Sequence, residues 1–74
     1  MFRMSIKDMG SACVTKDVMI HRDRRDDAES VAEKICSDIT GRDGLTFFDP
    51  GDMEYIVYDG LILIGSYWLT RFNR

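Results

Sequence analysis

Three side chains of this sequence have the most obvious capacity for chemistry: the only histidine, His21, and the two cysteines, Cys13 and Cys36. With Asp23 they could ligate zinc, but structural zinc sites usually place paired ligands at short spacing along the chain. The sequence contains no such pair. We therefore expect no metal site and no cofactor, and we interpret His21 as a surface residue at the end of a strand.

A cysteine beside a histidine could also act as a nucleophile with its base. Cys36 falls toward the C-terminal end of a predicted helix, where the helix dipole raises the pKa of a thiol instead of lowering it. It flanks the apolar stripe of that helix, which favours a packing role. Cys13 has no neighbour in the sequence that would activate it. We predict no catalytic residue, and a protein that is not an enzyme.

The carboxylates form no directed catalytic pair. Asp49 and Asp52 flank a Pro-Gly turn, and Asp59 precedes a glycine in a hairpin loop, so turn chemistry accounts for all three. Asp26 and Glu29 have the spacing of a helix capping box. The chain also lacks the glycine-rich motifs that bind phosphate groups.

Four arginines could contact a nucleic-acid backbone: Arg22, Arg24, Arg25 and Arg71. Tyr67 and Trp68 could then stack on bases. However, acidic residues interleave with the first three arginines, and the net charge is −3, from 10 basic and 13 acidic residues. This pattern is more typical of a solvated, salt-bridged loop. A small nucleic-acid-binding regulator is therefore our alternative hypothesis.

Length and composition indicate one domain over residues 1–74. The apolar fraction of 45% and the charged fraction of 31% are ordinary for a globular protein. Two cysteines are too few for a secreted disulfide scaffold. The longest aliphatic run, "LILI", is too short to span a membrane, and the N-terminus does not resemble a signal peptide. We expect a cytoplasmic protein with reduced thiols and no membrane contact.

The residue pattern predicts an α+β fold with the order ββαβββ, a single helix packed on a small antiparallel sheet. Clean alternation of apolar and polar residues predicts a strand over 2–7, and β-branched residues predict a second over 12–21. A helix is expected over 27–40, followed by a short strand at 45–49. A C-terminal β-hairpin over 53–69 completes the sheet.

The predicted helix has apolar residues at helical spacing: Ala28, Val31, Ala32, Ile35 and Ile39. Asp26 is expected to cap its N-terminus, with Glu29 completing a capping box. Gly41 is expected to end it.

The hairpin is predicted to turn at Asp59-Gly60 in a two-residue type I′ loop, which pairs Tyr58 with Leu61 and Val57 with Ile62. Both faces of the hairpin are then apolar. One face would hold Ile56, Tyr58, Leu61, Leu63, Tyr67 and Leu69. The other would hold Met53, Tyr55, Val57, Ile62, Ile64, Trp68 and Phe72.

One helix can cover only one of these faces. The other could be covered by the first two strands, by a second copy in a homodimer, or by a different protein. The residues expected at such a partner or dimer interface are Tyr55, Val57, Ile62, Ile64 and Trp68.

Our leading hypothesis is a small non-enzymatic interaction protein that binds a larger protein and occludes part of its surface. By analogy with other chains of this size, viral or mobile-element inhibitors of host nucleic-acid-handling or defence machinery fit this description. Acidic side chains could then stand where phosphates bind. The candidates are Asp49, Asp52, Glu54 and Asp59 around the hairpin, or Asp26, Asp27 and Glu33 on the helix.

Overall fold

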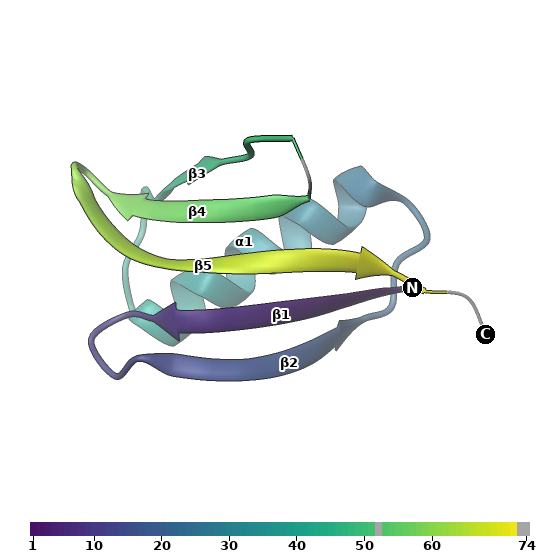
Figure 1. The fold of residues 1–74 in the computed structure, drawn as a ribbon, viewed down its shortest axis with the longest axis horizontal. Helices are drawn as coiled ribbons and strands as arrows, with labels where there is room; N and C mark the ends of the chain where they lie inside the picture. Colours follow the sequence, from purple (N-terminus) through teal and green to yellow (C-terminus); the bar gives the residue numbers. More distant parts are fainter. Residues whose placement is uncertain (52, 73–74) are drawn as a thin grey trace.

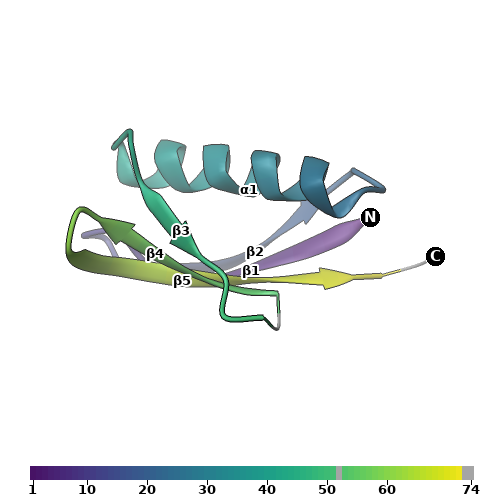
Figure 2. The same ribbon diagram turned by 90° about the horizontal axis from the view of Figure 1, so that it is seen from above.

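The structure, a computed structural model, describes residues 1–51 and 53–72. Its elements are β1 (Phe2–Met9), β2 (Val14–Ile20), α1 (Arg25–Thr40), β3 (Thr46–Phe48), β4 (Glu54–Asp59) and β5 (Ile62–Arg71). The strands form one antiparallel sheet in the order β2-β1-β5-β4-β3, and α1 lies across one face of it (Figures 1 and 2). The predicted α+β fold and its ββαβββ order are confirmed.

The two ends of the described chain meet at the centre of the sheet. β1 and β5 pair along most of their length, with Phe2 opposite Arg71, and the Phe72 N–H donates to the Met1 carbonyl at 3.0 Å. Figure 1 shows the two strands side by side, with β2 and β3 at the outer edges.

The core fills the space between α1 and the inner face of the sheet. Alternation in β1 buries Phe2, Met4 and Ile6 toward the helix, as predicted. The buried helix residues, Ala28, Ala32 and Cys36, are small. Small side chains allow the helix axis to come close to the sheet, and α1 contacts β1 and β2. The rest of the core comes from β5, β4 and the strand ends: Met9, Ile20, Tyr55, Val57, Tyr67 and Leu69.

The start of the helix differs from the prediction. The helix begins at Arg25, its N-cap is Arg24, and the cap has no side-chain hydrogen bond. The predicted capping box of Asp26 and Glu29 is therefore wrong, because Glu29 turns toward the sheet and accepts a hydrogen bond from Tyr55. The predicted end is confirmed: Gly41 is left-handed with φ 68° and donates its N–H to the Ser37 carbonyl at 2.8 Å.

The hairpin register also differs from the prediction. Asp59 pairs with Ile62 and Tyr58 with Leu63, so the two loop residues are Gly60 and Leu61. This shift moves each cross-strand partner by two residues, as from Leu61 to Leu63 opposite Tyr58. Because side chains alternate between the faces with a period of two, the shift alone leaves every side chain on its predicted face.

A bulge at Ile64 then reverses the second half of β5. Val57 pairs with Gly65 and not with Ile64, so the residues beyond the bulge change face. As a result Tyr67 and Leu69 lie in the core, whereas Trp68 lies on the outer face of the sheet.

Gly65 permits this bulge because β1 passes very close to it. A Cβ atom at Gly65 would lie 2.8 Å from the Cα atom of Met9. The Gly10 N–H donates to the Ile64 carbonyl at 2.8 Å, which fixes the bulged residue against the end of β1. β1 is itself irregular here, with Asp8 at φ 52°.

Candidate interaction surface

The five residues predicted to form an interface do not share one surface. Tyr55 and Val57 are 4% and 0% exposed beneath the helix, so they belong to the core. Ile62 is 68% exposed near the hairpin loop, and Ile64 is the partly buried bulge residue. Trp68 lies on the opposite side of the sheet from Tyr55 and Val57. The predicted grouping was wrong because it ran one face straight through the bulge.

The structure instead brings four apolar or aromatic residues together on the outer face of β3, β4 and β5. We call Phe48, Ile56, Tyr58 and Trp68 the outer-face patch. Phe48 is paired with Ile56 and is 55% exposed, and the other three are half-buried. Trp68 lies diagonally across from Ile56, because its direct partner on β4 is Glu54. Long side chains can bridge this diagonal separation.

The other half of the outer face is polar. Arg3, Ser5 and Lys7 alternate outward along β1, and they are opposite Thr70, Trp68 and Ser66 of β5. β1 and β2 continue the sheet and do not fold over it, so the prediction that they might cover the second face is wrong (Figure 2). Among the described elements, none covers the outer-face patch.

The acidic candidates around the hairpin have different surroundings. Asp49 accepts a hydrogen bond from Arg25 at 2.6 Å and one from the Gly51 N–H at 2.8 Å. Asp59 forms an ion pair with Arg42 at 2.8 Å. Asp52 lies outside the described residues. Glu54 is paired with Trp68 beside the outer-face patch.

The acidic candidates on the helix are all exposed: Asp26, Asp27 and Glu33. Partial burial, helped by the negative charge of Glu29, raises the pKa of Glu33. These residues lie on the far side of the molecule from the outer-face patch, because the helix covers the inner face.

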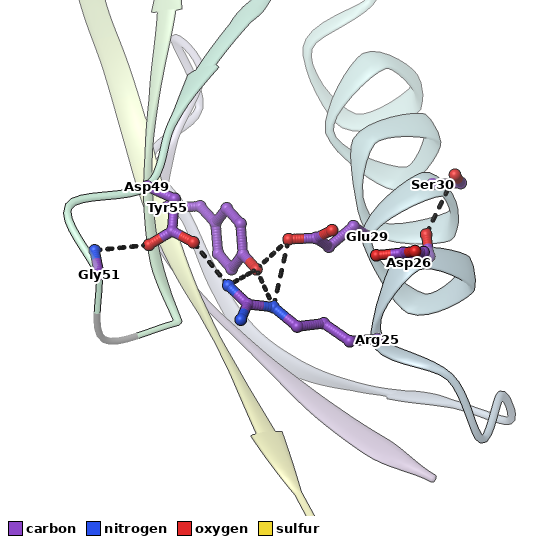
Figure 3. Close-up of polar contacts among 7 residues, drawn as sticks. All are labelled: Arg25, Asp26, Glu29, Ser30, Asp49, Gly51 and Tyr55. Atoms are coloured by element: carbon purple, nitrogen blue, oxygen red, sulfur yellow. Dashed lines mark hydrogen bonds and ion pairs between the residues drawn. The ribbon is translucent and has the colours of Figure 1, made fainter.

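A polar network fastens the start of α1 to the sheet (Figure 3). Tyr55 donates its hydroxyl hydrogen to Glu29, and its hydroxyl oxygen accepts hydrogen bonds from Arg25 at 3.2 and 3.3 Å. Arg25 also forms an ion pair with Asp49 before β4. The pKa of Tyr55 is raised to about 12. Burial is the largest cause, and the hydrogen bond to Glu29 is the second. The sequence analysis missed this network, although Arg25 and Glu29 have the four-residue spacing of a helical ion pair.

Three of the four candidate nucleic-acid-binding arginines make internal contacts. Arg25 belongs to the network above. The Arg71 guanidinium lies 4.7 Å from the centre of the Phe2 ring and donates to the Asp23 carbonyl at 3.0 Å. Arg22 donates to the carbonyl of His21 at 2.9 Å. The structure thus gives these arginines roles at the start of the helix and at the end of β5.

The two cysteines and the histidine lie in different parts of the structure. Cys36 is fully buried, and burial raises the pKa of its thiol to about 12. Cys13 is exposed in the β1–β2 turn, and His21 is exposed after β2. Within residues 1–51 and 53–72, no three His, Cys, Asp or Glu side chains are grouped so that they could hold a metal ion.

A groove of about 780 Å³ opens at one end of the molecule, between the β1–β2 turn and the end of the β4–β5 hairpin. The regular pairing of β1 and β5 stops at Lys7 and Ser66, contact continues to the hydrogen bond between Gly10 and Ile64, and the two hairpin loops diverge beyond it (Figure 1). Thr40 at the end of α1 and Arg42 just after it line the groove, and the groove overlaps the outer-face patch at Ile56 and Trp68, beside Glu54. Sequence reasoning missed the groove because it depends on the bulge.

Three consecutive aliphatic residues project beside this groove. We call Leu61, Ile62 and Leu63 the hairpin tip. Their exposed fractions are 99%, 68% and 60%. Hairpin loops are usually rich in polar residues and glycine, so the aliphatic composition of this tip is unusual.

In the part of the chain that the structure describes, no helix is long and apolar enough to cross a membrane. Comparisons of the chain with protein-family models, with curated proteins and with solved structures find no match.

Proposed function

We propose that this protein is a non-enzymatic binding protein that docks its outer-face patch on a larger protein and occludes part of that protein's surface. The observation that carries the proposal is the uncovered group of Phe48, Ile56, Tyr58 and Trp68 on a sheet whose inner face is already packed against α1. A contiguous apolar group on the surface of a small protein usually marks an interaction surface.

The residue types support a protein as the partner. Aromatic side chains are enriched at the centres of protein interfaces, where they anchor the contact. The patch offers three of them beside one carboxylate, Glu54. A basic side chain of the partner next to Glu54 would complete the contact, in keeping with the net charge of −3.

The position of Glu54 favours a different protein over a second copy at this patch. A two-fold axis along β4 would stack Ile56 on its own copy in the second chain. The same axis would bring the two copies of Glu54 against each other in apolar surroundings, and like charges there oppose association.

The mode of action in this proposal is occlusion, in the cytoplasm, of host nucleic-acid-handling or defence machinery, as viral and mobile-element inhibitors do. Two observations support it. The exposed helix face carries Asp26, Asp27 and Glu33, which could oppose a basic surface. Both thiols are free, which suits a reducing compartment.

The test compares Phe48→Asp with a matched variant, Met19→Asp. Met19 is also an exposed apolar residue, but it lies on β2 in the polar half of the outer face. A partner captured with the wild-type chain is purified, and its Kd is measured by calorimetry. We expect Phe48→Asp to weaken binding about tenfold or more and Met19→Asp to change it little. Equal binding by both variants would contradict the proposal.

The same preparation addresses the alternative function. A nucleic-acid-binding regulator would bind nonspecific DNA or RNA at low salt, and that affinity would fall steeply as salt rises. Such binding, lost on substitution of Arg22 and Arg24, would favour the alternative over protein docking.

A further inference from the structure

The charged side chains that line the groove do not balance. Two of them are basic, Lys7 and Arg42, and three are acidic, Asp8, Glu54 and Asp59. Arg42 and Asp59 form an ion pair at 2.8 Å, and Lys7 stands next to Asp8 in β1. Glu54 forms no ion pair with any residue that the structure describes. The lining therefore carries one negative charge in excess, and Glu54 is the carboxylate that a positively charged ligand would neutralise.

Glu54 lies beside the only tryptophan of the chain. Trp68 is its direct partner across β4 and β5, and both residues line the groove. Residues directly opposite each other in an antiparallel pair project from the same face, so the carboxylate and the indole ring are neighbours. Both side chains are half-buried. A carboxylate next to an aromatic ring suits a cation, because the ring face attracts positive charge and the carboxylate pairs with it.

Trp68 differs in this respect from two other aromatic rings of the protein. The Arg71 guanidinium lies 4.7 Å from the centre of the Phe2 ring, and the Arg3 guanidinium lies 5.9 Å from that of Phe72. Among the residues that the structure describes, none places a cation over the Trp68 ring in this way. The position is therefore open to a cation from another molecule.

We propose that the groove receives an arginine side chain of the protein partner, with its guanidinium against Trp68 and Glu54. Arginine suits this site better than lysine, because a planar guanidinium can stack on an indole ring and donate two parallel hydrogen bonds to a carboxylate. This inference rests on the proposed function and deepens it, since it names the chemical group by which the partner is recognised.

The rest of the groove suits aliphatic residues on either side of that arginine. Ile56, Leu63 and Ile64 line it, and Leu63 is 60% exposed. The volume of about 780 Å³ lies within the range of clefts that enclose drug-sized ligands, roughly 300–1,000 Å³. The groove can therefore hold a short peptide segment and not only one side chain. The expected occupant is a partner segment in which aliphatic residues flank an arginine.

The first experiment is a fluorescence titration, in which Trp68 reports directly on the site because it is the only tryptophan. The probe is N-acetyl-leucyl-arginyl-leucinamide, and the matched probe carries citrulline, which has nearly the same shape and no charge. We expect a saturable change with the arginine probe, weakened by added salt. The citrulline probe should bind about fivefold or more weakly. No saturable change, or equal affinity of the two probes, would overturn the proposal.

A lysine probe separates arginine from any other cation. N-acetyl-leucyl-lysyl-leucinamide has the same charge, but its ammonium group cannot stack flat on the ring while it pairs with the carboxylate. It should therefore bind more weakly than the arginine probe. Equal affinity would overturn the assignment to arginine.

The second experiment changes the protein. Glu54→Gln removes the carboxylate and keeps the shape of the side chain, and Glu33→Gln makes the same charge change on the exposed face of α1. Circular dichroism checks that both variants are folded. Glu54→Gln should weaken binding of the arginine probe about fivefold or more, and Glu33→Gln should change it little. Equal effects of the two variants would show that net charge alone attracts the probe, which contradicts the proposed site.

The same variants distinguish failure of this inference from failure of the proposed function. Phe48 belongs to the outer-face patch and does not line the groove. If Phe48→Asp weakened binding of the purified partner and Glu54→Gln did not, docking at the patch would stand and the arginine contact would be overturned. If the arginine probe required Glu54 while Phe48→Asp left partner binding unchanged, the arginine site would stand without docking at the patch.

Discussion

Two tyrosine rings stack between α1 and the sheet, with their centres 4.8 Å apart, and their hydroxyl groups have opposite surroundings. The Tyr55 hydroxyl bonds Glu29 and Arg25. The Tyr67 hydroxyl is buried and has no hydrogen-bond partner within residues 1–51 and 53–72. Loss of a hydrogen bond between partly buried groups lowers the free energy of unfolding by about 1 kcal/mol. Removal of a buried hydroxyl that has no partner breaks no hydrogen bond and carries no such loss.

We therefore predict opposite effects of two equivalent substitutions. Tyr55→Phe should lower the free energy of unfolding by about 1–2 kcal/mol, because Glu29 and Arg25 lose a shared partner. Tyr67→Phe should leave it unchanged or raise it by about 1 kcal/mol. Urea unfolding of both variants measures this, and an equal loss in both would show that the hydroxyl contacts do not distinguish the two rings.

The same buried groups predict sensitivity to alkaline pH. Burial is the main cause that raises the pKa of Cys36 from 9.0 to about 12 and that of Tyr55 from 10.0 to about 12. In this range the unfolded chain binds fewer protons than the folded chain, so stability is complete below pH 9 and falls as pH rises toward 12. Urea midpoints measured in steps over this range should decline, and less so when Cys36→Ala and Tyr55→Phe are combined. Urea midpoints that stay constant over this pH range would contradict the raised pKa values of Cys36 and Tyr55.

At the scale of the elements, the bulge in β5 is the feature on which the outer surface depends. It turns Trp68 outward and opens the groove beside Ile64. The close approach of Met9 to Gly65 leaves no space for a side chain, since a Cβ atom would also lie 3.1 Å from the Asp8 carbonyl oxygen.

Gly65→Ala should therefore destabilise the fold by about 1–3 kcal/mol, the usual effect of overpacking. Ser66→Ala is the matched control, because the next residue already has a Cβ atom and should change stability by less than about 0.5 kcal/mol. Thermal unfolding of the two variants makes the comparison. Equal midpoints would show that β1 can move away from the bulge.

The uncapped start of α1 predicts a stabilising change. Arg24 is the N-cap and makes no side-chain cap bond. Asp is among the best N-cap residues and also suits the positive end of the helix dipole. Arg24→Asp should raise the free energy of unfolding by about 0.5–1 kcal/mol, whereas Arg22→Asp, with the same charge change outside the helix, should not. Stabilisation by both variants would assign the effect to net charge alone.

These elements also show why sequence reasoning reached the fold but not the surface. Alternation in β1 and the stop at Gly41 are local patterns, and both were predicted correctly. The helical stripe of α1 was predicted only in part, because Cys36 is buried whereas Val31, Ile35 and Ile39 are partly buried. The faces of β5 depend on one inserted residue, Ile64, whose position is set by contact with β1 from the other end of the chain. Glycine within a strand was the available signal, because it often marks a bulge or a close backbone approach.

At the scale of the whole molecule, the central pair of strands joins the two ends of the sequence. β1 and β5 are neighbours, so the most central strand pairing closes only when nearly the whole chain is present. Pairings between distant residues slow folding, because the entropy of loop closure is lost before the contacts form.

A circular permutant tests this arrangement. A short glycine-rich linker would join the chain ends near the Phe72–Met1 hydrogen bond, and new ends would open at Asp43-Gly44, where both residues are exposed. β5 and β1 then become a local hairpin at the centre of the sheet. We expect the permutant to keep the far-ultraviolet circular dichroism of the wild type and to refold faster in stopped-flow measurements. New ends at Asp8-Met9 instead would cut the strand that fixes the bulge and should prevent folding. If the first permutant failed to fold while the second succeeded, the junction of β1 and β5 would not be the centre of the fold.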